Sequence, residues 1–368
     1  MRAHRLGLFV LAAGIAGASA APGAVLPSSA DGAGFEQALA PREFEFPRDH
    51  GAHPTFAHEW WYLTGHLDAS SGERFGFELT FFRVALGPAA SAAADASQWR
   101  ARQMYLAHFA LTDIGRGQFH FQERSAREAL GLSGASASPL KVWLDDWSLE
   151  EADGTWRIHA AARGYALDLQ MTAQHGPVLN GEHGLSQKSS APGDASYYYS
   201  IPRLAVRGQL VREAQALDVS GTAWLDREWG SGGLGADEVG WDWFALQLAD
   251  GSELMFYSLR RRDGGMDPHS GGTWVGADGR VRALSSADVR ILVQGYWTSP
   301  RGGRYPALWT VEVPAIGLRV ALRPELADQE LEGPPRYWEG AVRLTGSRGA
   351  RAIGGAGYVE LVGYAPTP

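Results

Sequence analysis

Apolar and polar residues alternate along most of this chain with the period of two that is typical of β-strands. The most informative stretch is 221–230, which has a glycine at each end. Alternation places Trp224, Asp226 and Glu228 on one face of that strand. A carboxyl among indoles resists ionisation unless a cation lies close, and Arg227 is the nearest cation in sequence. Asp226 is therefore either paired with an arginine or keeps its proton and acts as an acid catalyst.

The same period predicts strands over most of the remaining chain, separated by short turns. They cover 58–67, 74–84, 104–111, 142–149, 155–161, 165–172, 197–200, 204–211, 239–248 and 254–260, with six more after residue 270. A mixture of Arg and Glu at 119–131 favours helical turns instead. Strands at this even spacing indicate an all-β fold built from antiparallel barrels or sandwiches.

The N-terminus has the pattern of a targeting signal. A basic start is followed by an apolar run at 6–18 that is too short to span a bilayer, and Ala18-Ser19-Ala20 offers a cleavage site. We expect a signal peptide at 1–20 and a flexible leader at 21–42. A glycine-rich segment at 230–235 predicts a boundary between an N-terminal domain, 43–229, and a C-terminal domain, 230–368.

Composition narrows the classes of function. The 368 residues carry a net charge of −8 without a basic run, so nucleic acid is not an expected partner. The chain contains no cysteine, which excludes disulfides, thiolate catalysis and a lipid-modified cysteine anchor. No later segment is long and apolar enough to span a membrane, so we expect a periplasmic or secreted protein that is not membrane-spanning.

Aromatic side chains on strand faces are the first candidate ligand-binding residues. Trp60 and Tyr62 share a polar-aromatic face of the strand at 58–67, and Tyr197 and Tyr199 point the same way from another strand. Paired phenols can stack on a flat ligand, stabilise a cation or donate protons. We expect these four rings to line one shared cavity; ordinary barrel packing is the alternative.

Other candidates are less specific. His108 lies in an apolar strand and is either a pocket residue or a hydrogen-bonded core residue, and Trp241 and Trp243 share a strand face. His50 and His53 are interpreted as loop histidines, because no third metal ligand stands at a familiar spacing. A nucleophile elbow, a zinc-binding helix and a dinucleotide fingerprint are absent from the sequence, and we predict no metal and no cofactor.

Several segments, taken in order, resemble the carotenoid 1,2-hydratase (hydroxyneurosporene synthase) family, in its secreted AttH-type branch with lipocalin-like domains. These segments are Glu59–Tyr62, Gly65–Leu67, Ala107–Asp113, Gly184–Ser186, Tyr197–Ser200, Trp224–Trp229 and Gly240–Phe244. Each is a weak signal alone, and together they span most of the chain after residue 42.

The resemblance implies two lipocalin-like antiparallel β-barrels and a reaction in which an acid protonates a double bond, aromatic rings steady the cation and water adds. It assigns Asp226 as the acid, Trp224 as its neighbour, and Tyr197 and Tyr199 as the pair that faces the cation. A tyrosine stands at 197 where the hydratases are expected to have histidine. The expected ligand-binding residues are Glu59, Trp60, Tyr62, His108, Glu228, Trp241 and Trp243.

Two functions follow as expectations. The first is an enzyme that adds water to, or hydrolyses, an apolar ligand such as a lipid or an isoprenoid-like molecule. The second is a non-catalytic carrier or chaperone for such a ligand, serving an envelope ABC transport system. An Asp226 hidden from water favours the enzyme, whereas an open apolar trough with exposed acids favours the carrier.

Overall fold

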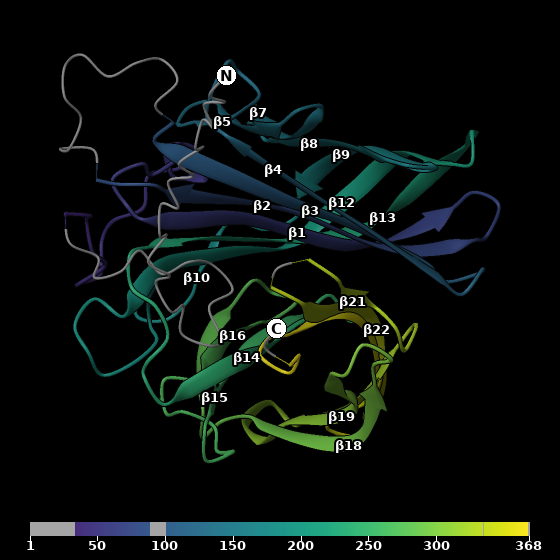
Figure 1. Cartoon of the computed structure of the whole chain (residues 1–368). Helices are drawn as coiled ribbons and strands as arrows, with labels where there is room; N and C mark the ends of the chain where they lie inside the picture. Colours follow the sequence, from purple (N-terminus) through teal and green to yellow (C-terminus); the bar gives the residue numbers. More distant parts are fainter. Residues whose placement is uncertain (1–33, 89–100, 334, 367–368) are drawn as a thin grey trace, which may run out of the picture.

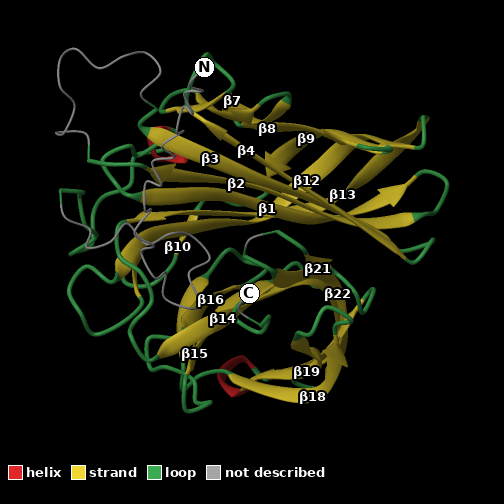
Figure 2. Cartoon of the chain, viewed as in Figure 1, coloured by secondary structure: helices red, strands yellow, loops and turns green. Residues whose placement is uncertain are grey.

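The computed structural model describes residues 34–88, 101–333 and 335–366 (Figure 1). The predicted signal peptide at 1–20 and the first part of the predicted leader, 21–33, lie outside the described residues. In the part of the chain that is described, β-strands and their connecting loops make up almost everything (Figure 2). Two short 3-10 helices, η1 (Arg48–His50) and η3 (Pro314–Ile316), accompany the strands.

The first half of the described chain folds into one antiparallel sheet. Its strands are β1 (His58–Ala69), β2 (Arg74–Ala85), β3 (Gln103–Asp113), β4 (Gln118–Arg127), β5 (Ser133–Ser136), β6 (Leu140–Leu144), β7 (Trp147–Ala152), β8 (Thr155–Ala162), β9 (Tyr165–Ala173), β10 (Val178–Leu179), β11 (Leu185–Gln187), β12 (Ala195–Arg212) and β13 (Gln215–Gly230). The order β4-β3-β2-β1-β13-β12-β9-β8-β7-β6-β5 curls round a core that contains Trp61, Trp147 and Trp229.

The second half forms another antiparallel sheet. Its strands are β14 (Glu238–Leu248), β15 (Glu253–Arg261), β16 (Gly271–Val275), β17 (Val281–Ser285), β18 (Arg290–Thr298), β19 (Arg304–Val313), β20 (Leu318–Pro324), β21 (Glu330–Leu331), β22 (Tyr337–Arg348) and β23 (Arg351–Leu361). This sheet runs in the order β17-β16-β15-β14-β23-β22-β20-β19-β18 around Phe244, Trp309 and Trp338. The predicted class, all-β with two lipocalin-like barrels, is confirmed.

The outer faces of the two barrels pack against each other. In Figure 1 the second barrel is seen nearly along its axis, directly below the long strands of the first. A third buried cluster lies between the barrels and contains Tyr62, Tyr198 and Trp224 from the first and Trp243 and Tyr257 from the second. Where the barrels pack together, each sheet buries one face in its own core and the other face against the second sheet. This explains why the strands at the contact carry large apolar residues on both faces.

Three local expectations need correction or qualification. Residues 119–131 do not form helical turns, because most of them belong to β4, whose partner strand β3 supplies the backbone hydrogen bonds. The single strand expected at 142–149 is a hairpin of β6 and β7. Residues 34–42 of the expected leader pack on the first barrel, where the Ala40 carbonyl accepts a 2.9 Å hydrogen bond from Tyr197.

The connection between the barrels is short. Strand β13 ends at Gly230 and β14 begins at Glu238, on either side of the glycine-rich segment. The domain boundary predicted there stays a prediction, which proteolysis can test. Among the described residues, no helix has the length and hydropathy needed to cross a membrane.

Candidate active site between the two barrels

Asp226 lies on the face of β13 that is turned toward the second barrel. Its side chain accepts hydrogen bonds from the Ser200 hydroxyl at 2.5 Å, from the Trp224 indole at 2.7 Å and from the Tyr198 hydroxyl. Strand register explains the arrangement, because Asp226 stands between Tyr62 of β1 and Ser200 of β12 in the sheet. Asp226 is 4% exposed.

Burial changes the acidity of Asp226. It raises the pKa of this carboxyl to about 7, while the hydrogen bonds from Ser200, Tyr198 and Trp224 act in the opposite direction. Near neutral pH, a carboxyl with this pKa is present in both its protonated and its ionised form. General acid–base catalysis needs this property.

Aromatic rings from both barrels surround Asp226. The Trp243 indole donates a 3.1 Å hydrogen bond to the Tyr198 hydroxyl, so Tyr198 links Asp226 to the second barrel. Trp243 also makes edge-to-face contacts with Tyr62, at 5.0 Å between ring centroids, and with Trp224, at 6.3 Å. Rings arranged in this way can stabilise a developing positive charge through their faces.

Two further carboxyls reach the same interface from the second barrel. Glu339 on β22 accepts a hydrogen bond from the Tyr62 hydroxyl, and Glu360 on β23 accepts one of 2.9 Å from the Trp241 indole. Burial raises the pKa of Glu360 to about 7. The pKa of Glu339 is raised well above its ordinary value by burial and by the nearby carboxyls of Glu360 and Glu78.

Glu228, two residues after Asp226 on the same face of β13, has a cationic partner. Its Oε1 lies 2.9 Å from the Lys188 ammonium group, and the Ser196 hydroxyl also bonds to it. The Lys188 nitrogen lies 4.7 Å from the ring centre of Tyr257, which extends the cluster into the second barrel. Burial opposes the charge on Lys188, but Glu228 and Tyr257 outweigh burial and raise its pKa.

Tyr197 and Tyr199 do not join this cluster, which corrects the expectation that they share a cavity with Trp60 and Tyr62. Both point into the first barrel, where the Tyr199 hydroxyl lies 2.6 Å from His50 Nδ1. The reason is a β-bulge in β12 between Ile201 and Leu204, which reverses the alternation of faces. The tyrosine that faces Asp226 is Tyr198.

Glu59 also lies away from Asp226, inside the end of the first barrel. It forms ion pairs with Arg83 and, at 2.6 Å, with Arg227. Burial opposes its charge, but the two guanidinium groups outweigh burial and hold the pKa of Glu59 well below its usual range. Arg227 is consequently not the partner of Asp226, because adjacent residues of a strand point to opposite faces.

The remaining predicted residues border the interface. Trp60 and Trp241 pack at its edge, and His108 on β3 is hydrogen-bonded at 2.7 Å to the Tyr337 hydroxyl of β22. Burial lowers the pKa of His108, against the influence of Glu123. The residues of the site that the sequence analysis missed are Glu78, Tyr198, Ser200, Glu339 and Glu360. Alternation places Tyr198 and Ser200 on the same strand face, but nothing in the sequence distinguishes the three glutamates.

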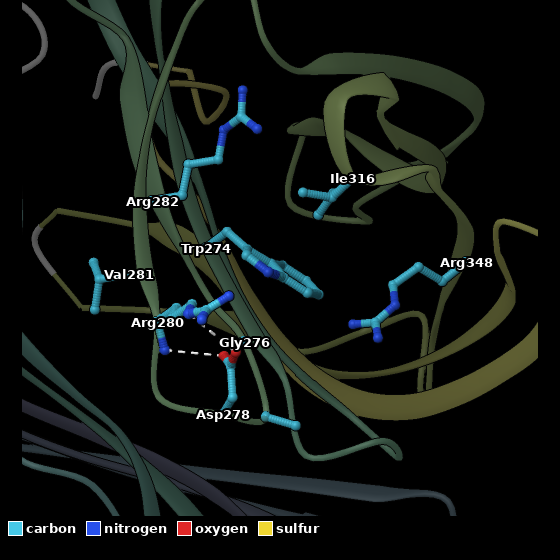
Figure 3. A pocket seen from close by; sticks show the side chains of 9 residues that line it. Trp274, Gly276, Asp278, Arg280, Val281, Arg282, Ile316 and Arg348 are labelled. Carbon is cyan, nitrogen blue, oxygen red and sulfur yellow. Dashed lines mark hydrogen bonds and ion pairs between the residues drawn. The ribbon is translucent and has the colours of Figure 1, made fainter.

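Two surface hollows lie elsewhere in the described structure. One of about 570 Å³ is at the end of the second barrel, where Figure 3 shows Trp274 between Arg282, Ile316 and Arg348. The other, of about 520 Å³, lies along β4 and is lined by residues such as His120 and Tyr165. None of the predicted site residues lines either hollow. The described residues contain no group of three or more His, Asp or Glu side chains placed to hold a metal ion.

Fold and site together define a two-barrel, lipocalin-like protein with buried carboxyl groups where the barrels meet. A family model for AttH-like proteins matches residues 37–364. The chain belongs to the AttH-like family, which confirms the resemblance stated from its sequence segments.

Solved structures and a curated relative agree with this assignment. An AttH crystal structure from Nitrosomonas europaea matches with a TM-score of 0.78 and 36% identity, over 89% of this chain and 100% of that one. Kievitone hydratase from Nectria haematococca shares the fold, with a TM-score of 0.68 and 16% identity over 90% of this chain and 96% of its own. The dehydratase asqC of Emericella nidulans is 23% identical over 221 residues, which are 56% of this chain and 61% of that protein. The matched region is thus less than two thirds of the length of asqC.

Proposed function

We propose that this protein catalyses acid-assisted addition of water to a double bond of an apolar ligand, or the reverse elimination, at the interface between its barrels. The observation that carries the proposal is the Asp226 carboxyl, which is buried among aromatic rings and has a pKa of about 7. Asp226 would donate its proton to one carbon of the double bond. The rings of Tyr62, Trp224 and Trp243 would stabilise the cation at the other carbon.

The names of two relatives support this direction. One similar structure is a hydratase and one similar sequence is a dehydratase, and the two names describe opposite directions of water transfer. A general acid whose pKa lies near the working pH serves both directions, because the same group gives the proton in one and receives it in the other.

The carrier hypothesis has less support from the geometry. A lipocalin carrier holds its ligand inside the barrel, and here large side chains such as Trp61, Trp229, Trp309 and Trp338 occupy the barrel interiors. Export to the periplasm or the medium, and service to an envelope ABC transporter, are proposals that rest on the sequence alone. Fractionation of cells that produce the full chain tests the first.

The reaction is testable with citronellol, an isoprenoid that carries one trisubstituted double bond and yields hydroxycitronellol on hydration. The purified chain should form hydroxycitronellol, and Asp226→Asn should lower the rate by about 100-fold or more while the variant remains folded. Asp242→Asn is the matched control, since Asp242 is a buried carboxyl that points away from the interface and pairs with Arg260 at 2.9 Å. Equal rates for wild type and Asp226→Asn would contradict the proposal.

A further inference from the structure

Two carboxyl groups, one from each barrel, act on each other across the interface: Glu78 on β2 and Glu339 on β22. Gly76, two residues before Glu78 on the same face, lies so close to the second barrel that a Cβ on it would come within 2.7 Å of the Ala341 Cβ. Ala341 follows Glu339 by two residues on its own strand face. The two strand segments are therefore in contact where the two carboxyls stand.

Both carboxyl groups are buried and only partly bonded. Glu78 and Glu339 are 0% and 1% exposed. Burial raises the pKa of Glu78 and the Thr80 hydroxyl on the same strand opposes this, but no hydrogen bond of regular geometry reaches either Glu78 oxygen among the described residues. Glu339 bonds to Tyr62 through Oε1, and its Oε2 has no partner among these residues. Buried polar atoms almost always have a partner, so three free carboxyl oxygens at one place indicate a position for a small polar group.

The groups around Glu78 and Glu339 are acidic or neutral, so neither carboxyl is half of a salt bridge. The polar groups that act on the pair are the carboxyls of Glu360 and Asp226 and the hydroxyls of Thr80, Tyr62, Tyr337 and Tyr358. No lysine or arginine among the described residues forms an ion pair with Glu78 or Glu339. Two unpaired carboxylates would repel each other at this depth, so the pair holds at least one proton and can donate and accept hydrogen bonds at once.

We propose that Glu78 and Glu339 bind the oxygen atom that enters or leaves the ligand, as water in hydration and as a tertiary hydroxyl group in dehydration. This inference rests on the proposed function and names the polar end of its substrate. Tyr62 connects the two parts of the site, because it stands beside Asp226 in the sheet and donates its hydroxyl hydrogen to Glu339.

The steps balance without any other reactant. The proton of Asp226 and the electron pair of the double bond form a C–H bond, which leaves a cation at the neighbouring carbon. A lone pair of the bound water forms the C–O bond, and the proton lost from that oxygen passes to the carboxylate of the Glu78–Glu339 pair. Return of one proton from the pair to Asp226 by way of solvent restores the starting state, so the net change is the addition of one water.

A crystal structure of the full chain tests the location. An ordered water within hydrogen-bond distance of both Glu78 and Glu339, replaced by the tertiary hydroxyl in crystals soaked with hydroxycitronellol, would support the inference. A direct hydrogen bond between the two carboxyls, with no water or hydroxyl between them, would overturn it whether or not the protein is catalytic.

Kinetics test the role. In ¹⁸O-labelled water, Glu78→Gln and Glu339→Gln should each form labelled hydroxycitronellol about 100-fold more slowly than wild type, with an unchanged melting temperature, because glutamine resembles a neutral glutamic acid but cannot accept the proton. Asp242→Asn should retain the wild-type rate. Full rates in both glutamine variants would overturn the inference, whereas a full rate in Asp226→Asn alone would overturn the proposed function and leave the Glu78–Glu339 pair standing.

Discussion

The Tyr62 hydroxyl of the first barrel donates a hydrogen bond to the Glu339 carboxyl of the second, and both side chains are buried. Burial raises the pKa of Tyr62 well above its ordinary value, and the nearby carboxyls act in the same direction. Tyr62 therefore remains a hydrogen-bond donor at neutral pH. The contact joins the two barrels beside Asp226, which is paired with Tyr62 in the sheet.

Replacing Tyr62 with phenylalanine should lower the free energy of unfolding by about 1–3 kcal/mol, because the Glu339 carboxyl would lose its bonded partner while it stays buried. Urea denaturation of the variant and the wild type measures the change. Tyr197→Phe is a suitable control, since the Tyr197 hydroxyl bonds at the barrel edge to the Ala40 carbonyl. A smaller loss in Tyr62→Phe than in the control would contradict the importance of this contact.

Asp226 should make stability depend on pH in a defined window. Its pKa is raised from 3.8 to about 7 in the folded state. A carboxyl with a raised pKa contributes stability that is fully present below pH 3.8 and is lost as the pH rises toward 7, at about 1.4 kcal/mol per unit. In Asp226→Asn the free energy of unfolding should decline less between pH 3.8 and about 7. Denaturation of the variant and the wild type at several pH values in this range measures the difference. Parallel curves would show that Asp226 ionises with an ordinary pKa.

The rate of hydration should also depend on the protonation of Asp226. Hydration needs the protonated form of Asp226, so the rate should fall as the pH rises through about 7. The measurement is the initial rate with citronellol across the pH range, with the folded state checked by circular dichroism at each point. A rate that increases through this range would assign the proton donor to another residue.

Arg227 should be important for folding and not for chemistry. Its guanidinium group is buried between Glu59 and the ring of Trp61, 3.9 Å from the ring centre, on the opposite face from Asp226. Arg227→Gln leaves Glu59 partly unpaired and should cost about 3–5 kcal/mol of stability. Any variant protein that remains folded should keep the pH profile of the wild type. A shifted profile would show that Arg227 acts on the site.

Limited proteolysis tests the domain boundary. The segment between β13 and β14 includes exposed residues at Gly233, Ala236 and Asp237, and a protease should cut there to give two fragments of domain size. The fragments should stay associated under native conditions because the aromatic interface joins them. Resistance at this segment combined with cleavage inside β14 would place the boundary elsewhere.

Alternation within a strand was enough to predict part of the site. Trp224, Asp226 and Glu228 share a face of β13 as expected, and Trp60 and Tyr62 share a face of β1, because the pleat fixes both relationships locally. The raised pKa of Asp226 also follows from its apolar neighbours in the sequence and the burial that they indicate.

Other parts of the site could not be predicted in this way. The apolar residues Leu204 and Val206 point into the first barrel, and alternation carried back from them turns Tyr197 and Tyr199 outward. The bulge beyond Ile201 reverses that assignment, and no residue type in the sequence marks it unambiguously.

Glu339 and Glu360 pose a different difficulty. They lie more than one hundred residues after Asp226, and they reach the site because whole barrel faces pack together. Docking of this kind depends on the shapes of both surfaces. A pattern read along one strand contains no information about it.

The position of the carboxyl groups between the barrels makes domain docking a proton-consuming process. On separate barrels, the carboxyls of Asp226, Glu360 and Glu78 would be more exposed to water, so their pKa values would lie closer to those of ordinary carboxyl groups. Docking removes them from water and raises all three pKa values, so near neutral pH the docked chain takes up protons that the open chain releases. Protons therefore act as ligands that bind the docked form more tightly than the undocked form. A lower pH stabilises the packing of one barrel on the other.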